Sequence, residues 1–112
     1  MAQTKQVVLV TTVKTTGKVV KNRFVDFAGK QAAAGVKVLG TATFDADAGD
    51  TLAVDALGIA LVEAGGTVAV GDEVAADAQG AAVKAVGNAK IAGTARSAAT
   101  AAGEIVQVFL KG

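Results

Sequence analysis

The sequence predicts an all-β fold, a small single-domain barrel or sandwich with an extended N-terminal arm. Glycine occurs 14 times in 112 residues, so a helix of typical length would have to contain it in its interior. Short valine-rich runs lie between glycine and aspartate, which is typical of strands. Many short strands with frequent turns favour a barrel or sandwich. We therefore expect an arm or edge strand over residues 1–17 and one β domain over residues 18–112.

Nine strands are expected from the valine runs and from the alternation of apolar and polar residues. The expected strands cover roughly residues 6–14, 18–27, 36–44, 51–54, 57–63, 67–70, 81–86, 89–96 and 104–110. Alternation is clearest over residues 23–27 and 105–109, where successive side chains would face opposite sides of a sheet. Glycine-containing turns separate the later strands. They are expected at Gly65-Gly66, Gly71-Asp72, Gly80, Gly87-Asn88 and Gly103-Glu104.

The chain contains an imperfect internal repeat. Gly40-Thr41-Ala42 returns as Gly93-Thr94-Ala95, and Ala48-Gly49-Asp50 returns as Ala102-Gly103-Glu104. The stretch 98–102 could form a helical turn, but its counterpart in the first copy favours a loop packed by small side chains in both copies. A chain that repeats itself in this way and contains no histidine, cysteine, tyrosine or tryptophan favours an architectural role.

The first strand is the candidate contact segment. No turn residue precedes Gly17, so Val7–Val13 could pair with a neighbouring chain as an extended arm. Lysines near such an edge also discourage unwanted pairing of sheets. The candidate contacts with a partner or a neighbouring subunit are Gln6, Val7, Val8, Leu9, Val10, Thr11, Thr12 and Val13, with Lys14 and Lys18 as supporting charges.

Charge is segregated along the sequence, although the net charge is only +1. Residues 1–44 carry seven basic residues and one acidic residue, whereas residues 45–77 carry eight acidic residues and no basic one. Such a chain can associate head to tail or lay its basic part on an acidic partner. Alternatively, strand pairing interleaves the segments and cancels their fields. The early basic residues do not keep one strand face, so a partner-facing or solvated edge is favoured over a nucleic-acid surface.

Several kinds of chemistry are excluded or disfavoured by composition. Without histidine or cysteine, the commonest general base, thiolate chemistry and most transition-metal sites are unavailable. Ser97 is the only serine, would need Lys84 or Lys90 as its base, and lacks a G-x-S-x-G elbow. Base stacking would rest on four phenylalanines, three of which we expect in the core. We expect no catalytic residue, no cofactor, no metal and no direct nucleic-acid binding.

The chain also carries no apolar run of the length needed for a membrane span. Its N-terminal apolar run is too short for a signal peptide. The absence of cysteine fits assembly in a reducing cytoplasm.

The acidic stretch 45–50 invites a calcium interpretation. An EF-hand loop needs an acid or Asn at position 5, glycine at position 6 and glutamate at position 12. Counted from Asp45, these positions hold Gly49, Asp50 and Ala56. A solvated turn is therefore expected, and a looser surface calcium site stays open.

A different class of function is suggested by Gly71-Asp72-Glu73-Val74. Biotinyl and lipoyl carrier domains contain similar turns, with an acceptor lysine on a hairpin. Val83-Lys84-Ala85 could form such a hairpin, but carriers place methionine on both sides of the lysine, or aspartate before it. A small carrier domain that uses Lys84 is the alternative from another class.

A set of ordered blocks resembles the capsid cement, or head decoration, proteins of tailed bacteriophages over roughly residues 20–110. Each block is weakly specific alone because it consists mainly of glycine, alanine and valine, but their order is more specific. The blocks cover residues 23–25, 34–42, 54–60, 62–66, 71–74, 77–83, 93–95 and 102–108.

The resemblance implies a compact, β-tulip-like fold and a non-enzymatic virion protein made in the bacterial host cytoplasm. Such a protein would bind the major capsid protein on the outside of the expanded head, often as a trimer, and bridge neighbouring subunits. Extended termini in this family generally reach onto capsid subunits, which the N-terminal segment here could do. A phage tail or adhesion module of the same β type is the alternative within the structural class.

Overall fold

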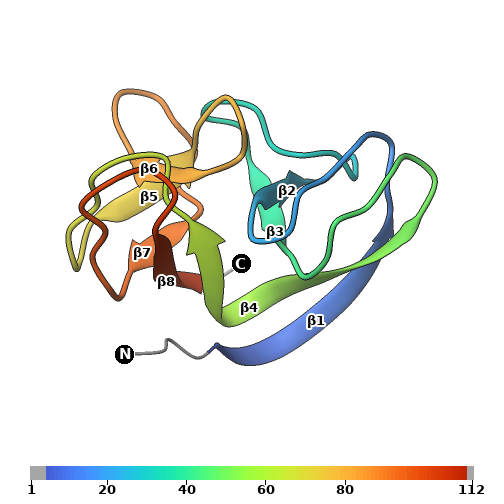
Figure 1. Ribbon diagram of the computed structural model, residues 1–112, viewed down its shortest axis with the longest axis horizontal. Helices are drawn as coiled ribbons and strands as arrows, with labels where there is room; N and C mark the ends of the chain where they lie inside the picture. Colours follow the sequence, from blue (N-terminus) through green and yellow to red (C-terminus); the bar gives the residue numbers. More distant parts are fainter. Residues whose placement is uncertain (1–4, 111–112) are drawn as a thin grey trace.

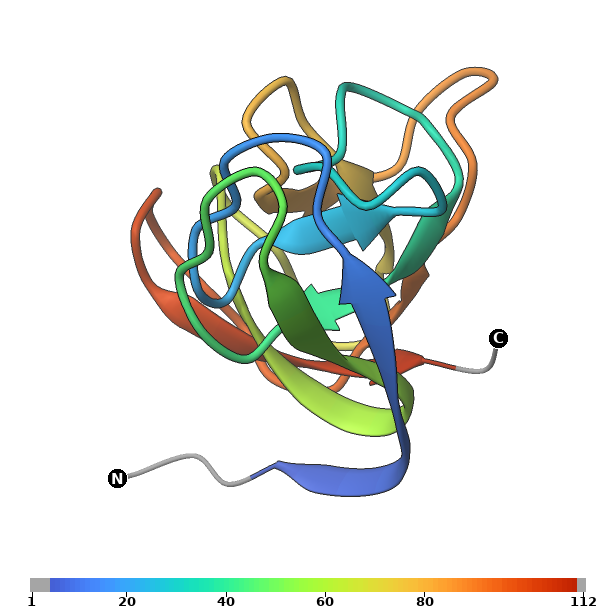
Figure 2. The same cartoon turned by 90° about the vertical axis from the view of Figure 1, so that its right-hand side faces the viewer.

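The computed structural model describes residues 5–110 and contains eight strands and no helix within them. The strands form one antiparallel sheet in the order β2-β3-β4-β8-β7-β5-β6, and β1 pairs with β4 outside that path. This sheet curls round on itself into a nearly closed barrel (Figures 1 and 2). The prediction of a small all-β barrel is confirmed. The strands are β1 (Gln6–Lys14), β2 (Phe24–Asp26), β3 (Val38–Ala42), β4 (Thr51–Glu63), β5 (Glu73–Ala76), β6 (Ala82–Lys84), β7 (Gly93–Ala95) and β8 (Ile105–Leu110).

The long strand β4 joins two core clusters. Its even-numbered side chains face inward, because alternate residues of a strand point to opposite sides. Leu52 and Val54 belong to one cluster, and Ala60 and Val62 belong to the other. Burying side chains of this size contributes on the order of 1–3 kcal/mol each. Both clusters consist almost entirely of valine and alanine, and Phe24 is the single large aromatic side chain in them.

The two halves of the chain repeat the same set of contacts. Val54 of β4 lies between Thr11 of β1 and Ala42 of β3, and Val108 of β8 holds the same place between β4 and β7. The first half therefore runs from β1 to the start of β4, and the second half runs from the end of β4 to β8. The repeat seen in the sequence is one part of this larger repeat.

The loops repeat as well. The backbone groups of Val19 and Ala46 bond reciprocally, and those of Val68 and Ala99 do the same in the second half. Both alanines are buried. The prediction that small side chains pack these two loops is confirmed, and the stretch 98–102 forms turns and bends instead of a helical turn.

Carboxylates close equivalent turns in the two halves. Asp26 and Asp77 each accept hydrogen bonds from the amides two and four residues later. The Asp50 carboxylate accepts a hydrogen bond from the Asp47 amide, and the Glu104 carboxylate accepts hydrogen bonds from the amide and the hydroxyl of Thr100. The bonds from Thr100 hold the pKa of Glu104 below its ordinary value.

The strand predictions are confirmed in part. The strand expected over 6–14 is β1, and the two strands expected over 51–54 and 57–63 are continuous as β4. The strand expected over 67–70 is wrong, because this segment contributes only an isolated bridge at Val68. The strand expected over 18–27 begins late, at Phe24, because Asn22 takes a left-handed backbone conformation (φ 66°) that turns the chain.

The expectation that three of the four phenylalanines lie in the core is wrong. Phe24 is fully buried, whereas Phe27, Phe44 and Phe109 are exposed. Their places in the chain explain this. Phe109 alternates with the buried Val108 and Leu110 of β8 and so faces outward, and Phe27 and Phe44 lie in the turn and the bend that follow β2 and β3.

Candidate functional site

The free edge of β1 is the main candidate contact surface. Within residues 5–110, β1 pairs with β4 alone, so its other edge carries unpaired backbone groups. Val8 is 81% exposed, and Leu9 and Val10 beside it are also exposed. An unpaired edge with exposed apolar side chains can accept a strand from a partner.

A bulge brings Val8 to the surface. The register between β1 and β4 shifts between Val7 and Leu9 and again between Leu9 and Val10, and such a bulge bends a strand and redirects its side chains. Gly58 of β4 lies under this point, in a left-handed conformation (φ 103°). A Cβ atom there would lie 2.4 Å from the carbonyl oxygen of Gln6. Glycine therefore permits β1 to lie directly on β4 at the bulge.

The predicted contact residues divide into two groups. Val7, Thr11 and Val13 are half-buried, and Val13 packs against a core cluster. The exposed residues of β1 are Gln6, Val8, Leu9, Val10, Thr12 and Lys14. Lys18 is exposed in the loop that follows. The segment expected as an arm is thus a strand of the sheet from Gln6 onward, residues 1–4 lie outside the described residues, and a contact with a partner stays a prediction.

A groove of about 470 Å³ lies beside β1. We call it the β1 groove, and its walls include Lys5, Val10, Lys21, Phe44, Asp55 and Leu61. Val10 and Phe44 are exposed apolar walls. Sequence reasoning did not identify this groove, because Phe44 was expected in a strand and its neighbours come from four separate segments.

A partly buried ion pair lies at the β1 groove. Lys5 Nζ and Asp55 Oδ2 are 3.1 Å apart, and the Asp55 side chain is only 5% exposed. Asp55 Oδ1 and the hydroxyl of Thr41, its cross-strand neighbour, are buried without a hydrogen-bond partner in the described chain. Losing Lys5 would leave a buried charge uncompensated, which is destabilising. From the sequence, Asp55 was identified only as part of the acidic segment 45–77, and its ion pair with Lys5 was not predicted.

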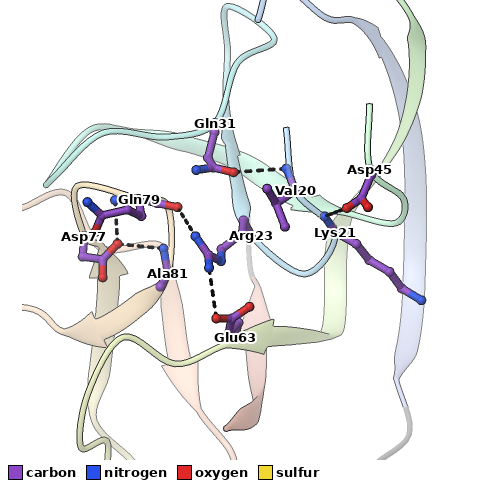
Figure 3. A network of polar contacts seen from close by, with 9 residues as sticks. All are labelled: Val20, Lys21, Arg23, Gln31, Asp45, Glu63, Asp77, Gln79 and Ala81. Atoms are coloured by element: carbon purple, nitrogen blue, oxygen red, sulfur yellow. Dashed lines mark hydrogen bonds and ion pairs between the residues drawn. The ribbon is translucent and has the colours of Figure 1, made fainter. Parts of the chain in front are cut away.

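A polar network joins the two halves (Figure 3). Arg23, which precedes β2, donates to the Gln79 carbonyl oxygen at 2.9 Å and to Glu63 Oε2 at 3.0 Å. Its two partners lie in the second half of the chain, so one guanidinium connects the halves. In the same region the Lys21 amide donates to Asp45 Oδ1 at 2.7 Å, and the Lys21 side chain extends away from the network (Figure 3).

We expect Arg23→Met to lower the free energy of unfolding by about 2 kcal/mol, because two hydrogen bonds of a charged group are lost and Glu63 loses its counter-charge. Urea denaturation measures this. Arg96→Met is the matched control, because Arg96 is exposed and makes no ion pair within residues 5–110. Equal effects of the two substitutions would contradict the role of Arg23 in joining the halves.

The candidate residues for other functions are not brought together. Ser97 Oγ accepts a hydrogen bond from the Gln107 amide at 2.9 Å, and neither Lys84 nor Lys90 is bonded to it within the described residues. Lys84 ends β6, opposite Val74, and the β5–β6 turn at residues 77–81 contains no lysine. Across residues 5–110, no three histidine, cysteine, aspartate or glutamate residues are placed to hold a metal ion. In the same range no helix is long and apolar enough to cross a membrane.

Comparisons with known proteins agree with the fold. No curated protein matches the sequence. Among solved structures, the chain is similar to the crystal structure of the head fiber gp8.5 N base of bacteriophage phi29. The TM-score is 0.76, the sequence identity is 22%, and the match covers 92% of this chain and 93% of that chain. Residues 2–110 match the model of the phage cement protein family, and the chain therefore belongs to this family of capsid-associated structural proteins.

Proposed function

We propose that this cement protein binds the outer surface of the expanded phage head and stabilises the capsid by bridging neighbouring capsid subunits, as trimers. The observation that carries the proposal is the match to the phage cement family over nearly the whole chain. The exposed, unpaired edge of β1 supports it by offering a surface for the capsid. This role requires no catalytic step, because the protein would stabilise the capsid by binding to its subunits.

Physical properties of β1 suit this role. Strand addition at a free edge uses backbone hydrogen bonds, and exposed side chains such as Val8 supply apolar contact. Lys14 and Lys18 lie at one end of the edge and would attract an acidic capsid surface. In a symmetric trimer, three modest contacts act together, so the overall affinity rises far above that of one contact.

Quantitative mass spectrometry of gradient-purified virions tests the proposed role directly. We expect a copy number comparable with that of the major capsid protein. A handful of copies would contradict the proposal in favour of a tail or vertex protein. Complete absence from the particle would overturn it, and an intact mass above that of the unmodified chain would then support the carrier function at Lys84.

A second experiment tests the β1 edge. We expect Val8→Asp to weaken binding to heads that lack the cement protein by about tenfold or more, because a charge would replace an apolar contact. Val86→Asp is the control, since Val86 is similarly exposed (74%) but lies in the loop after β6, a strand that does not pair with β1. Point substitutions are preferable to removing residues 2–12, because that deletion would remove most of β1 from the sheet. Equal binding of the two variants would exclude this edge as the capsid contact.

A further inference from the structure

A trimer places a strict demand on the surface of its subunit. In a cyclic trimer each contact is made by two different patches, one from each copy. The subunit must therefore carry two complementary patches at different places. We propose that the β1 groove of one copy receives the 69–73 turn of the next copy. This inference rests on the trimer of the proposed function and names its contact.

The groove offers an apolar pocket with a free positive charge. Val10 and Phe44 wall it, and Phe44 is 67% exposed. Its volume of about 470 Å³ is ample for a valine side chain with its flanking backbone. Lys5 is held by Asp55, but Lys21 makes no ion pair within residues 5–110. The groove is therefore suited to an apolar side chain that is followed by an acidic one.

The 69–73 turn has this sequence. Val70 is 66% exposed at the turn, and Gly71 follows it in a left-handed conformation (φ 90°). Asp72 and Glu73 come next, and Glu73 is exposed without an ion pair in the described chain. Asp72 is less available for a partner, because one of its carboxylate oxygens accepts a hydrogen bond from the Ala69 amide. Val70 would enter the groove, and Glu73 would approach Lys21.

The repeat of the two halves supports the same contact. The 69–72 turn is the second-half counterpart of the 20–23 turn, since each is closed by the same backbone hydrogen bond, from Asp72 to Ala69 and from Arg23 to Val20. The first turn carries Lys21, together with Arg23, which is paired with Glu63, whereas the second ends at Asp72 and is followed by Glu73. Two turns of the same construction therefore carry opposite charges. Contacts between unlike turns are attractive and contacts between like turns are repulsive, which favours head-to-tail association.

The two patches also lie on different sides of the molecule. In Figure 1 the segment between β4 and β5, which contains residues 69–72 of the turn, passes along the left edge. Of the strands that contribute to the groove, β1 runs along the bottom to the lower right and β3 lies near the centre, both away from that edge (Figure 1). One copy can therefore use both patches at once, each toward a different neighbour.

Cysteine cross-linking tests the contact, since the natural chain contains no cysteine. Ala53→Cys, in a wall of the β1 groove, and Ala69→Cys, at the 69–73 turn, are mixed, in solution and on heads, and treated with a short bismaleimide, so that Lys21 and Val70 stay in place. We expect a 53–69 cross-linked species in large excess over that given by Ala53→Cys mixed with Val86→Cys, the control for an exposed residue elsewhere. A yield no higher than that of the control, both in solution and on heads, overturns the inference.

Charge reversal provides the second readout. Lys21→Glu and Glu73→Lys are each expected to weaken self-association about tenfold, and the double variant to recover most of the loss, because the two charges would again be opposite. Sedimentation velocity measures association in solution, and copies per head are counted in parallel. Full head binding without the cross-link or the charge rescue would overturn the inference and leave the proposed function standing. Failure of the unsubstituted chain to bind heads would overturn the proposed function.

Discussion

Gly40→Ala is expected to lower the free energy of unfolding by about 3 kcal/mol or more. Gly40 lies in β3 against β4, and a Cβ atom there would lie 2.2 Å from the Asp55 carbonyl oxygen and 2.7 Å from a methyl carbon of Val54. The first contact is with backbone, so relief requires β3 and β4 to separate. Separation would also disturb the buried cluster around Val54. Chemical denaturation followed by circular dichroism measures the change.

The repeat of the two halves provides a second, equivalent position at which to test this effect. Gly93 lies in β7 against β8, and a Cβ atom there would lie 2.4 Å from the Phe109 carbonyl oxygen. Gly93→Ala should therefore have an effect similar to that of Gly40→Ala. Gly66→Ala is the control, because nothing lies within 4 Å of its added methyl group. It should change stability by about 1 kcal/mol or less. A small loss at Gly40 or Gly93 would show that the strands can move apart at little cost.

The strands that the sequence predicted well are those with a strong local signal. β1 and β8 are rich in β-branched residues, and both were expected within a residue of their bounds. The segment of β5, Glu73–Ala76, was not expected as a strand, since it has one β-branched residue and two alanines. It forms a strand because β6 and β7 pair with it on both sides. Such tertiary pairing is invisible in a local pattern.

The internal repeat was only partly recognisable for a related reason. Gly40 and Gly93 recur in the sequence because the neighbouring strand lies too close for a side chain, and Gly49 and Gly103 recur because both take a left-handed backbone conformation (φ 91° and 93°). The turn closed by Asp26 recurs at Asp77 with the same hydrogen bonds, but most residues around the two aspartates differ. The backbone geometry is retained while the side chains change, so the full repeat became apparent only from the contacts.

The candidate contact surface was predictable as a segment but not as a surface. The valine-rich N-terminal strand was identified in full, whereas the division into exposed and half-buried residues depends on the bulge at Val8. The β1 groove could not be predicted, because it needs the curvature that brings Lys21 and Phe44 beside β1. Neither feature follows from residue spacing.

Gly58→Ala is expected to detach the first part of β1 from β4 and to lower the free energy of unfolding by about 3 kcal/mol or more. Two effects add at this position. Alanine is strained at a φ of 103°, and its methyl group would lie 2.4 Å from the Gln6 oxygen and 2.8 Å from the Val8 nitrogen. Denaturation measures the loss, and amide hydrogen exchange locates it, with protection falling first in β1.

Gly49→Ala separates these two effects. Gly49 has a similar left-handed conformation (φ 91°), but nothing lies within 4 Å of an added methyl group. This variant should therefore show the backbone strain alone, about 1–2 kcal/mol, with β1 protection unchanged. Equal losses at Gly49 and Gly58 would mean that the contact with β1 contributes nothing to stability. A larger loss at Gly58, confined to β1, would establish that one glycine holds the candidate contact strand on the body of the protein, and head binding should then fall with it.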